Sequence, residues 1–195
     1  MITVVDYGAG NISSVKKAFE HLGVQVQVSS EPAIIAAAAK LAVPGVGHFN
    51  RCEALNNSLR APVMDAIGRG VPFLGICVGM QWLFEGSTES PETPGAALFS
   101  GQCSRFPTTV KSPHVGWNQV DVKPGSRLLR NVADHAFVYF THSYRAPVVA
   151  ETIACTEYGG EFSAAVEKGN IFGVQFHPEK SGSSGLQILE NFCAL

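Results

Sequence analysis

The chain has 195 residues, of which 46% are hydrophobic and 15% charged, so it is long enough to bury a core of its own as one domain. A formal net charge of -2 provides no basic surface for nucleic acid or for anionic lipid. No apolar run approaches the roughly 18 residues that a membrane-spanning helix needs. We therefore predict a single domain over residues 1–195 that binds neither nucleic acid nor membranes.

The first residues and the cysteines bear on the compartment. The opening stretch MITVVDYG is interrupted by Asp6 and is typical of a first strand rather than of an export signal. The five cysteines form an odd set without a C-x-x-C pair, which disfavours a disulfide framework and a zinc ribbon. We expect a cytoplasmic protein with reduced thiols.

Short β-branched runs alternate with helical stretches through the N-terminal half. Strands are predicted at residues 2–5, 24–28, 40–43 and 71–76. Helices are predicted at residues 12–23, 33–39 and 61–70, with Gly23 as the stop signal of the first. This alternation of strand and helix predicts a mainly parallel sheet that is covered on both faces.

The C-terminal half begins with a stretch rich in Ser, Thr, Pro and Gly, Glu85 to Lys111, which we interpret as a long surface excursion. Strands then follow at residues 118–122, 136–142, 151–156, 163–167 and 171–176, before a helix at 184–195. We predict an open α/β sandwich with additional antiparallel strands in this half. Ligands of open α/β sheets bind beyond the carboxyl ends of the strands, so the loops there are the candidate site.

One such loop contains a thiol between two glycines. The stretch GICVG, Gly75 to Gly79, follows a predicted buried strand and precedes a predicted helix, which is the context of a nucleophile in a sharp turn. Cys77 is therefore the candidate nucleophile. Because a helix dipole alone activates a thiol only weakly, a separate base is also expected.

The stretch VQFHPEK supplies that base. His177 ends an apolar strand, and Glu179 lies two residues further on, where an extended backbone places both side chains on one face. A carboxylate bound to one imidazole nitrogen leaves the other free to take the thiol proton. A lone cysteine or a lone His-Pro-Glu is more often structural. Together, on a fold that gathers strand ends, they favour catalysis.

Other loops are less specific. PGVG, Pro44 to Gly47, offers backbone N–H groups for an oxyanion but is equally typical of a tight turn. THSY, Thr141 to Tyr144, suits a polar wall for a small zwitterion or a purely structural role. The glycines of DYGAGN match no nucleotide motif. Because the histidines lack metal-ligand spacing, we predict neither a metal ion nor another cofactor.

The stretches GICVGMQ and GVQFHPEKS together closely resemble the class I (triad) glutamine amidotransferases. DYGAGN, PGVGHF, HVGWN and THSYR narrow the resemblance to the glutaminase subunits of imidazole glycerol phosphate synthases, over essentially the whole chain. It implies a flavodoxin-like sandwich that hydrolyses glutamine to glutamate and ammonia. It also implies a heterodimer with a (β/α)8-barrel cyclase, which uses the ammonia to form imidazole glycerol phosphate and aminoimidazole carboxamide ribotide in histidine biosynthesis.

The resemblance also implies roles for individual residues. The nucleophile falls on Cys77, the base on His177 and the third member of the triad on Glu179. The oxyanion donors fall on the backbone N–H groups of Gly45 and Val78, although the family more often has leucine at the second position. The implied glutamine-holding residues are Gly47, Gln81, His142, Ser143 and Tyr144. The residues implied to face the cyclase are Asn11, Trp117 and Lys180.

Three alternatives stay open at this point. The chain could be the glutaminase subunit of another amidotransferase, serving anthranilate, aminodeoxychorismate or pyridoxal synthesis, although DYGAGN and HVGWN disfavour this. It could be a noncatalytic binding or scaffolding subunit on the same fold. It could also be a cysteine peptidase or γ-glutamyl hydrolase that uses the same nucleophile turn.

Overall fold

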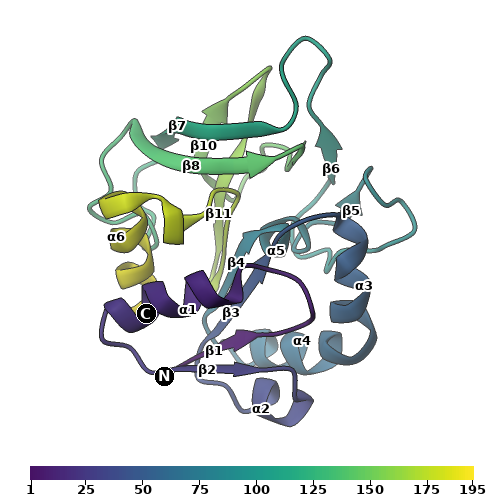
Figure 1. Ribbon diagram of the computed structural model, residues 1–195, viewed down its shortest axis with the longest axis vertical. Coiled ribbons are helices and arrows are strands. Elements are labelled where there is room, and N and C mark those ends of the chain that lie inside the picture. The colour runs from purple at the N-terminus through teal and green to yellow at the C-terminus, as the bar shows by residue number, and fades with distance from the viewer.

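A nine-stranded sheet runs through the computed structural model, which describes residues 1–195 (Figure 1). The strand order is β2-β1-β3-β4-β12-β11-β10-β7-β8. The first five strands in this order pair in parallel, and from β12 onward each pair is antiparallel. The sheet therefore consists of a parallel half and an antiparallel half that meet at β12.

The parallel half is made of short strands, most of them buried on both faces. Their bounds are β1 Ile2–Val5, β2 Val26–Ser29, β3 Leu41–Gly45, β4 Phe73–Cys77 and β12 Ile171–Val174. Continuous apolar runs suit strands that are covered on both sides, because neither face meets water. The order 2-1-3-4-5 of these strands is that of flavodoxin-like folds, so the predicted fold class is confirmed.

Helices cover this half on two sides, with α1 and α6 together on one and α3 and α4 on the other (Figure 1). The helices are α1 Ile12–His21, α2 Pro32–Ala36, α3 Cys52–Ala54, α4 Arg60–Gly68, α5 Val78–Gln81 and α6 Gly182–Cys193. The short helices η1 Phe49–Arg51, η2 Leu55–Leu59 and η3 Pro178–Lys180 complete the set. None of the helices is both long and apolar enough to cross a bilayer.

The antiparallel half is formed by the C-terminal strands, as predicted. These are β7 His114–Val122, β8 Ala136–His142, β10 Thr152–Glu157 and β11 Glu161–Lys168. A second, three-stranded sheet contains β5 Gly86–Ser87, β6 Gln102–Arg105 and β9 Tyr144–Arg145. One cluster of 47 buried hydrophobic residues extends through both halves.

Two sequence-based expectations need correction. The stretch from Glu85 to Lys111 is not simply a surface excursion, because Phe99, Cys103 and Phe106 are buried and the segment contributes β5 and β6. Its apolar residues lack a regular spacing, so periodicity could not reveal that they pack into the core. The strand predicted at residues 118–122 begins four residues earlier, because His114 is already the first residue of β7.

Candidate active site

Cys77 is the last residue of β4 and directly precedes α5, which is the turn that the sequence predicts. Its backbone has φ 56° and ψ -109°, a strained conformation for a residue with a side chain. The turn is tight: a Cβ on Gly75 would lie 2.4 Å from the carbonyl oxygen of Gly79, and one on Gly79 would lie 1.9 Å from that of Val43. Both glycines are therefore required for the close passage of strand and helix, as expected.

The predicted oxyanion donors lie beside this turn. Gly45 ends β3 and is the direct register partner of Cys77, while Val78 is the next residue along the chain. A Cβ on Gly45 would lie 2.7 Å from the Cβ of Val78, so the two backbones are in close contact. Backbone N–H groups from two adjacent segments can thus approach a ligand near the sulfur.

His177 reaches the same place because β12 is the parallel neighbour of β4, with Val174 opposite Ile76. Nδ1 of His177 donates a hydrogen bond to Oε1 of Glu179 at 2.9 Å, and both side chains are 1% exposed. The backbone N–H of His177 donates to the carbonyl of Tyr139 in β8 at 2.9 Å. The ring is therefore held by a carboxylate on its own loop and by the antiparallel half.

The other nitrogen of His177, Nε2, is buried and has no hydrogen-bond partner. The nearby Cys77 nevertheless affects the pKa of the ring. Burial lowers the pKa of the imidazole, but its interactions with Cys77 and Glu179 outweigh burial and raise the pKa to about 10. The site thus favours an imidazolium beside the sulfur, which is the pairing that a thiolate nucleophile needs.

A cavity of about 270 Å³ opens in front of the sulfur. It is lined by Gly47, Cys77, Val78, Gln81, Glu89, Pro113, Thr141, His142, Ser143 and Tyr144. All five residues implied to hold glutamine are among them. The cavity lies below the common size range of sites for drug-sized ligands, so it suits a molecule as small as an amino acid.

The wall of the cavity is fixed by buried polar contacts. Nδ1 of His142 donates to the carbonyl of Tyr144 at 2.8 Å, and Nε2 of Gln81 donates to the same oxygen at 2.8 Å. Nε2 of His142 then accepts from Nδ1 of His114 at 3.4 Å. Burial lowers the pKa of His142 to about 3 and that of His114 to about 4, so both rings are neutral at pH 7.

The residues implied to face a partner lie outside the cavity. Trp117 on β7 is 54% exposed and packs edge-to-face on Tyr139, with ring centroids 6.0 Å apart. Nζ of Lys180 lies 5.7 Å from the centroid of the same tyrosine ring. Asn11 directly precedes α1, whose residues contact η3. Trp117 and Lys180 therefore share one surface, and this surface adjoins the loop that carries His177.

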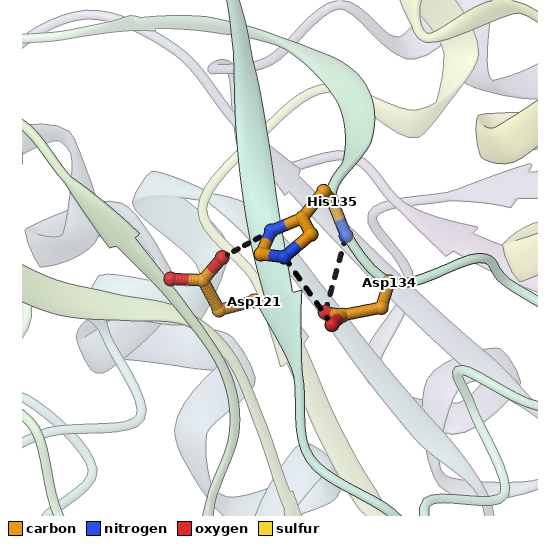
Figure 2. Close-up of side chains that lie close together, drawn as sticks. All are labelled: Asp121, Asp134 and His135. Carbon is orange, nitrogen blue, oxygen red and sulfur yellow. Dashed lines mark hydrogen bonds and ion pairs between the residues drawn. The ribbon is translucent and has the colours of Figure 1, made fainter.

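Metal-ligand side chains gather away from this site. Asp121, Asp134 and His135 have ligand atoms within 4.8 Å of one another, and all three are exposed (Figure 2). Nδ1 of His135 lies 2.8 Å from Asp121, and Nε2 lies 3.5 Å from Asp134, so both ring nitrogens already have carboxylate partners. A surface cluster whose side chains contact one another accounts for this arrangement.

The model of the class-I glutamine amidotransferase family matches residues 3–195. The chain belongs to this family. It is 44% identical to the imidazole glycerol phosphate synthase subunit HisH of Salinibacter ruber, covering 100% of the chain and 94% of the relative. It is 46% identical to the HisH subunit of Methanothermobacter thermautotrophicus, covering 98% and 97%. At this sequence identity over nearly the whole length, the chain belongs to the HisH group of class-I amidotransferases.

Solved structures give the same fold at low sequence identity. A crystal structure described as a glutamine amidotransferase aligns with a TM-score of 0.77 at 18% identity, covering 99% of this chain and 100% of the other. The structure of PurLQS from Thermotoga maritima aligns with a TM-score of 0.77 at 18% identity, covering 99% and 97%. These likenesses confirm the fold class for this HisH-group chain.

The sequence reasoning missed two cavity residues and one neighbour of the sulfur. Glu89 and Pro113 line the cavity, and the amide of Gln175 contacts Cys77. Gln175 could have been found, because it lies two residues before His177 and thus on the same face of an extended chain. Glu89 lies in the irregular stretch, where no pattern signals a role.

Proposed function

We propose that Cys77, His177 and Glu179 form the catalytic triad of this chain, which is the glutamine amidotransferase subunit, HisH, of an imidazole glycerol phosphate synthase in histidine biosynthesis. The observation that carries the proposal is the convergence of a strained thiol turn, a carboxylate-bound imidazole and an amino-acid-sized cavity at one point. We further propose that residues 1–195 act as one amidotransferase domain.

The geometry supports a two-step hydrolysis. The thiolate of Cys77 attacks the side-chain amide carbon of glutamine, and the backbone N–H groups of Gly45 and Val78 stabilise the oxyanion. The imidazolium of His177 gives its proton to the departing nitrogen, which leaves as ammonia. Water that is deprotonated by the same ring then cleaves the thioester to glutamate, while Glu179 holds the ring in place.

The cavity wall supplies contacts for the rest of the amino acid. We propose that Gly47, Gln81, His142, Ser143 and Tyr144 hold glutamine. Glu89 adds a carboxylate to the lining, which is suited to the α-ammonium group. Because the rings of His142 and His114 are neutral, they add no positive charge that would repel that group.

Relatives named as subunits of imidazole glycerol phosphate synthase imply a second subunit. We propose a heterodimer with a (β/α)8-barrel cyclase that receives the ammonia in a cytoplasmic complex. Asn11, Trp117 and Lys180 would face this partner. Exposed apolar side chains on β7 and β8 support the choice of surface, because Val115, Trp117 and Phe137 are each more than half exposed.

A thiol-reactive glutamine analogue tests the proposed nucleophile. The analogue should label Cys77 stoichiometrically, and excess glutamine should prevent the labelling; peptide mass spectrometry identifies the modified cysteine. The matched control is D-glutamine, which should not prevent the labelling of Cys77. Labelling of another cysteine, or none at all, would contradict the triad.

Co-purification with a barrel cyclase, followed by assay of glutamine hydrolysis with and without its nucleotide ligand, tests the pathway.

A further inference from the structure

Gln175 is a fully buried amide that directly follows β12 and has no role in the steps above. Its Nε2 donates to Sγ of Cys77 at 3.7 Å. Its Oε1 accepts a hydrogen bond from Nε2 of Gln81 at 3.1 Å. Gln175 thus connects the nucleophile to a residue that lines the substrate cavity.

The orientation of this amide follows from a contact that cannot be reversed. Gln81 lies against the carbonyl oxygen of Tyr144, which can only accept a hydrogen bond, so Gln81 presents its NH₂ group there. The same NH₂ group faces Gln175, which must therefore present its oxygen to Gln81. This leaves the NH₂ group of Gln175 for Cys77.

An N–H donor aimed at sulfur favours the thiolate over the thiol, because a hydrogen bond to a charged acceptor is stronger than one to a neutral acceptor. We propose that Gln175 is a positioning residue for the nucleophile: its amide N–H holds the sulfur of Cys77 as thiolate, and Gln81 fixes that amide. The inference rests on the proposed function of Cys77, since a thiolate matters only if this sulfur reacts.

The isosteric variant Gln175→Glu separates this role from simple filling of space. It retains an oxygen that can accept from Gln81 but replaces the NH₂ group facing the sulfur by a second oxygen. Gln175→Leu removes the donor without adding charge. The readout is the rate at which iodoacetamide modifies Cys77 in the full-length chain, measured as a function of pH and resolved by peptide mass spectrometry.

Loss of one hydrogen bond to a charged group lowers the equilibrium constant for forming that charge by a factor of about ten or more. We expect Gln175→Leu to slow alkylation of Cys77 at pH 7 about tenfold and to move the alkylation profile toward higher pH by roughly one unit. Gln175→Glu should move the profile further, because an ionised carboxylate repels the thiolate.

Two controls keep the result specific. Val174→Ala removes buried volume at the preceding residue, the last of β12, whose side chain lies on the opposite face, so it should lower the melting temperature without moving the profile. Gln102→Leu replaces an exposed amide and should change neither quantity. Melting temperatures are measured for every variant.

The outcomes are distinct. If wild-type Cys77 reacts no faster than the other cysteines, the proposed nucleophile fails, and this inference fails with it. If Cys77 is selectively reactive but both Gln175 variants follow the wild-type pH profile, the triad stands and only the role of Gln175 is overturned. A profile displaced in the order wild type, Gln175→Leu, Gln175→Glu supports it.

Discussion

The parallel and antiparallel halves of the sheet contribute to the site by different physical means. In the parallel half, Cys77 is positioned by backbone packing, with a glycine whose Cβ would lie 1.9 Å from a carbonyl oxygen. Beside the antiparallel half, the cavity wall is positioned by side-chain hydrogen bonds, which His142 at the end of β8 and Gln81 of α5 donate to the carbonyl of Tyr144 in β9. The backbone packing therefore fixes the position of Cys77 tightly. The hydrogen bonds of the cavity wall can instead be removed one at a time by substitution.

The parallel half should be indispensable for chemistry on glutamine. Cys77→Ala removes the nucleophile, and we expect glutamine hydrolysis to fall by a factor on the order of 10⁴ or more. The reaction of the cyclase with added ammonium salt should persist, because the partner needs only ammonia. Both activities are measured in the reconstituted complex. Loss of both would show that the two sites are not separate.

The backbone packing in this half should tolerate no added methyl group. Gly79→Ala would force the chain of β3 away from α5, and we expect the free energy of unfolding to fall by about 3 kcal/mol. Gly68→Ala is the matched control in α4, since its Cβ would meet nothing within 4 Å. That variant should be neutral or more stable by up to about 1 kcal/mol. Equal effects in urea unfolding would contradict the close-packing explanation.

The affinity for the cyclase should depend most on the antiparallel half. Trp117→Ala removes the exposed ring that packs on Tyr139, and we expect affinity for the cyclase to fall about thirtyfold, the size of an interface hot spot. Val148→Ala changes another exposed apolar residue, away from β7 and β8, and should leave affinity unchanged. Isothermal titration with the purified cyclase measures both, and an unchanged affinity for Trp117→Ala would move the interface elsewhere.

Mild acid should weaken the antiparallel half. Burial lowers the pKa of His114 to about 4 and that of His142 to about 3, whereas the unfolded chain takes up these protons near pH 6.5. The unfolded state therefore binds more protons below pH 6.5, and the free energy of unfolding should fall as the pH decreases toward 3. His177 keeps its proton in the folded state because its pKa is raised, so it adds a slope of the opposite sign near pH 6.5, where the unfolded chain still releases that proton, and none well below that pH.

The window from about pH 5.5 to 5 isolates these two histidines best, because the unfolded chain has by then taken up the proton of His177 and most carboxylates titrate below this window. Replacement of His114 by Phe keeps a ring against Phe140 and Tyr158 and should flatten the dependence. Urea unfolding at several pH values measures the slope. If the variant has the same slope as the wild type, His114 takes up its proton equally in the folded and unfolded states, and this explanation is wrong.

The sequence by itself determined much of this protein. The alternation of apolar strand and helix predicted the parallel half, and the β-rich C-terminal segments predicted the added strands. The glycines around Cys77 and the spacing of His177 and Glu179 predicted the reactive groups, because turn geometry and hydrogen bonding over two residues are local properties of the chain.

The tertiary structure alone decided which distant residues meet. β12 pairs with β4, which brings the segments of Cys77 and His177 together from positions 100 residues apart. The same pairing aims the amide of Gln175 at the sulfur, and folding of the irregular stretch brings Glu89 into the cavity. Strand order and the path of a loop depend on how the whole core packs, and local spacing carries no record of that packing.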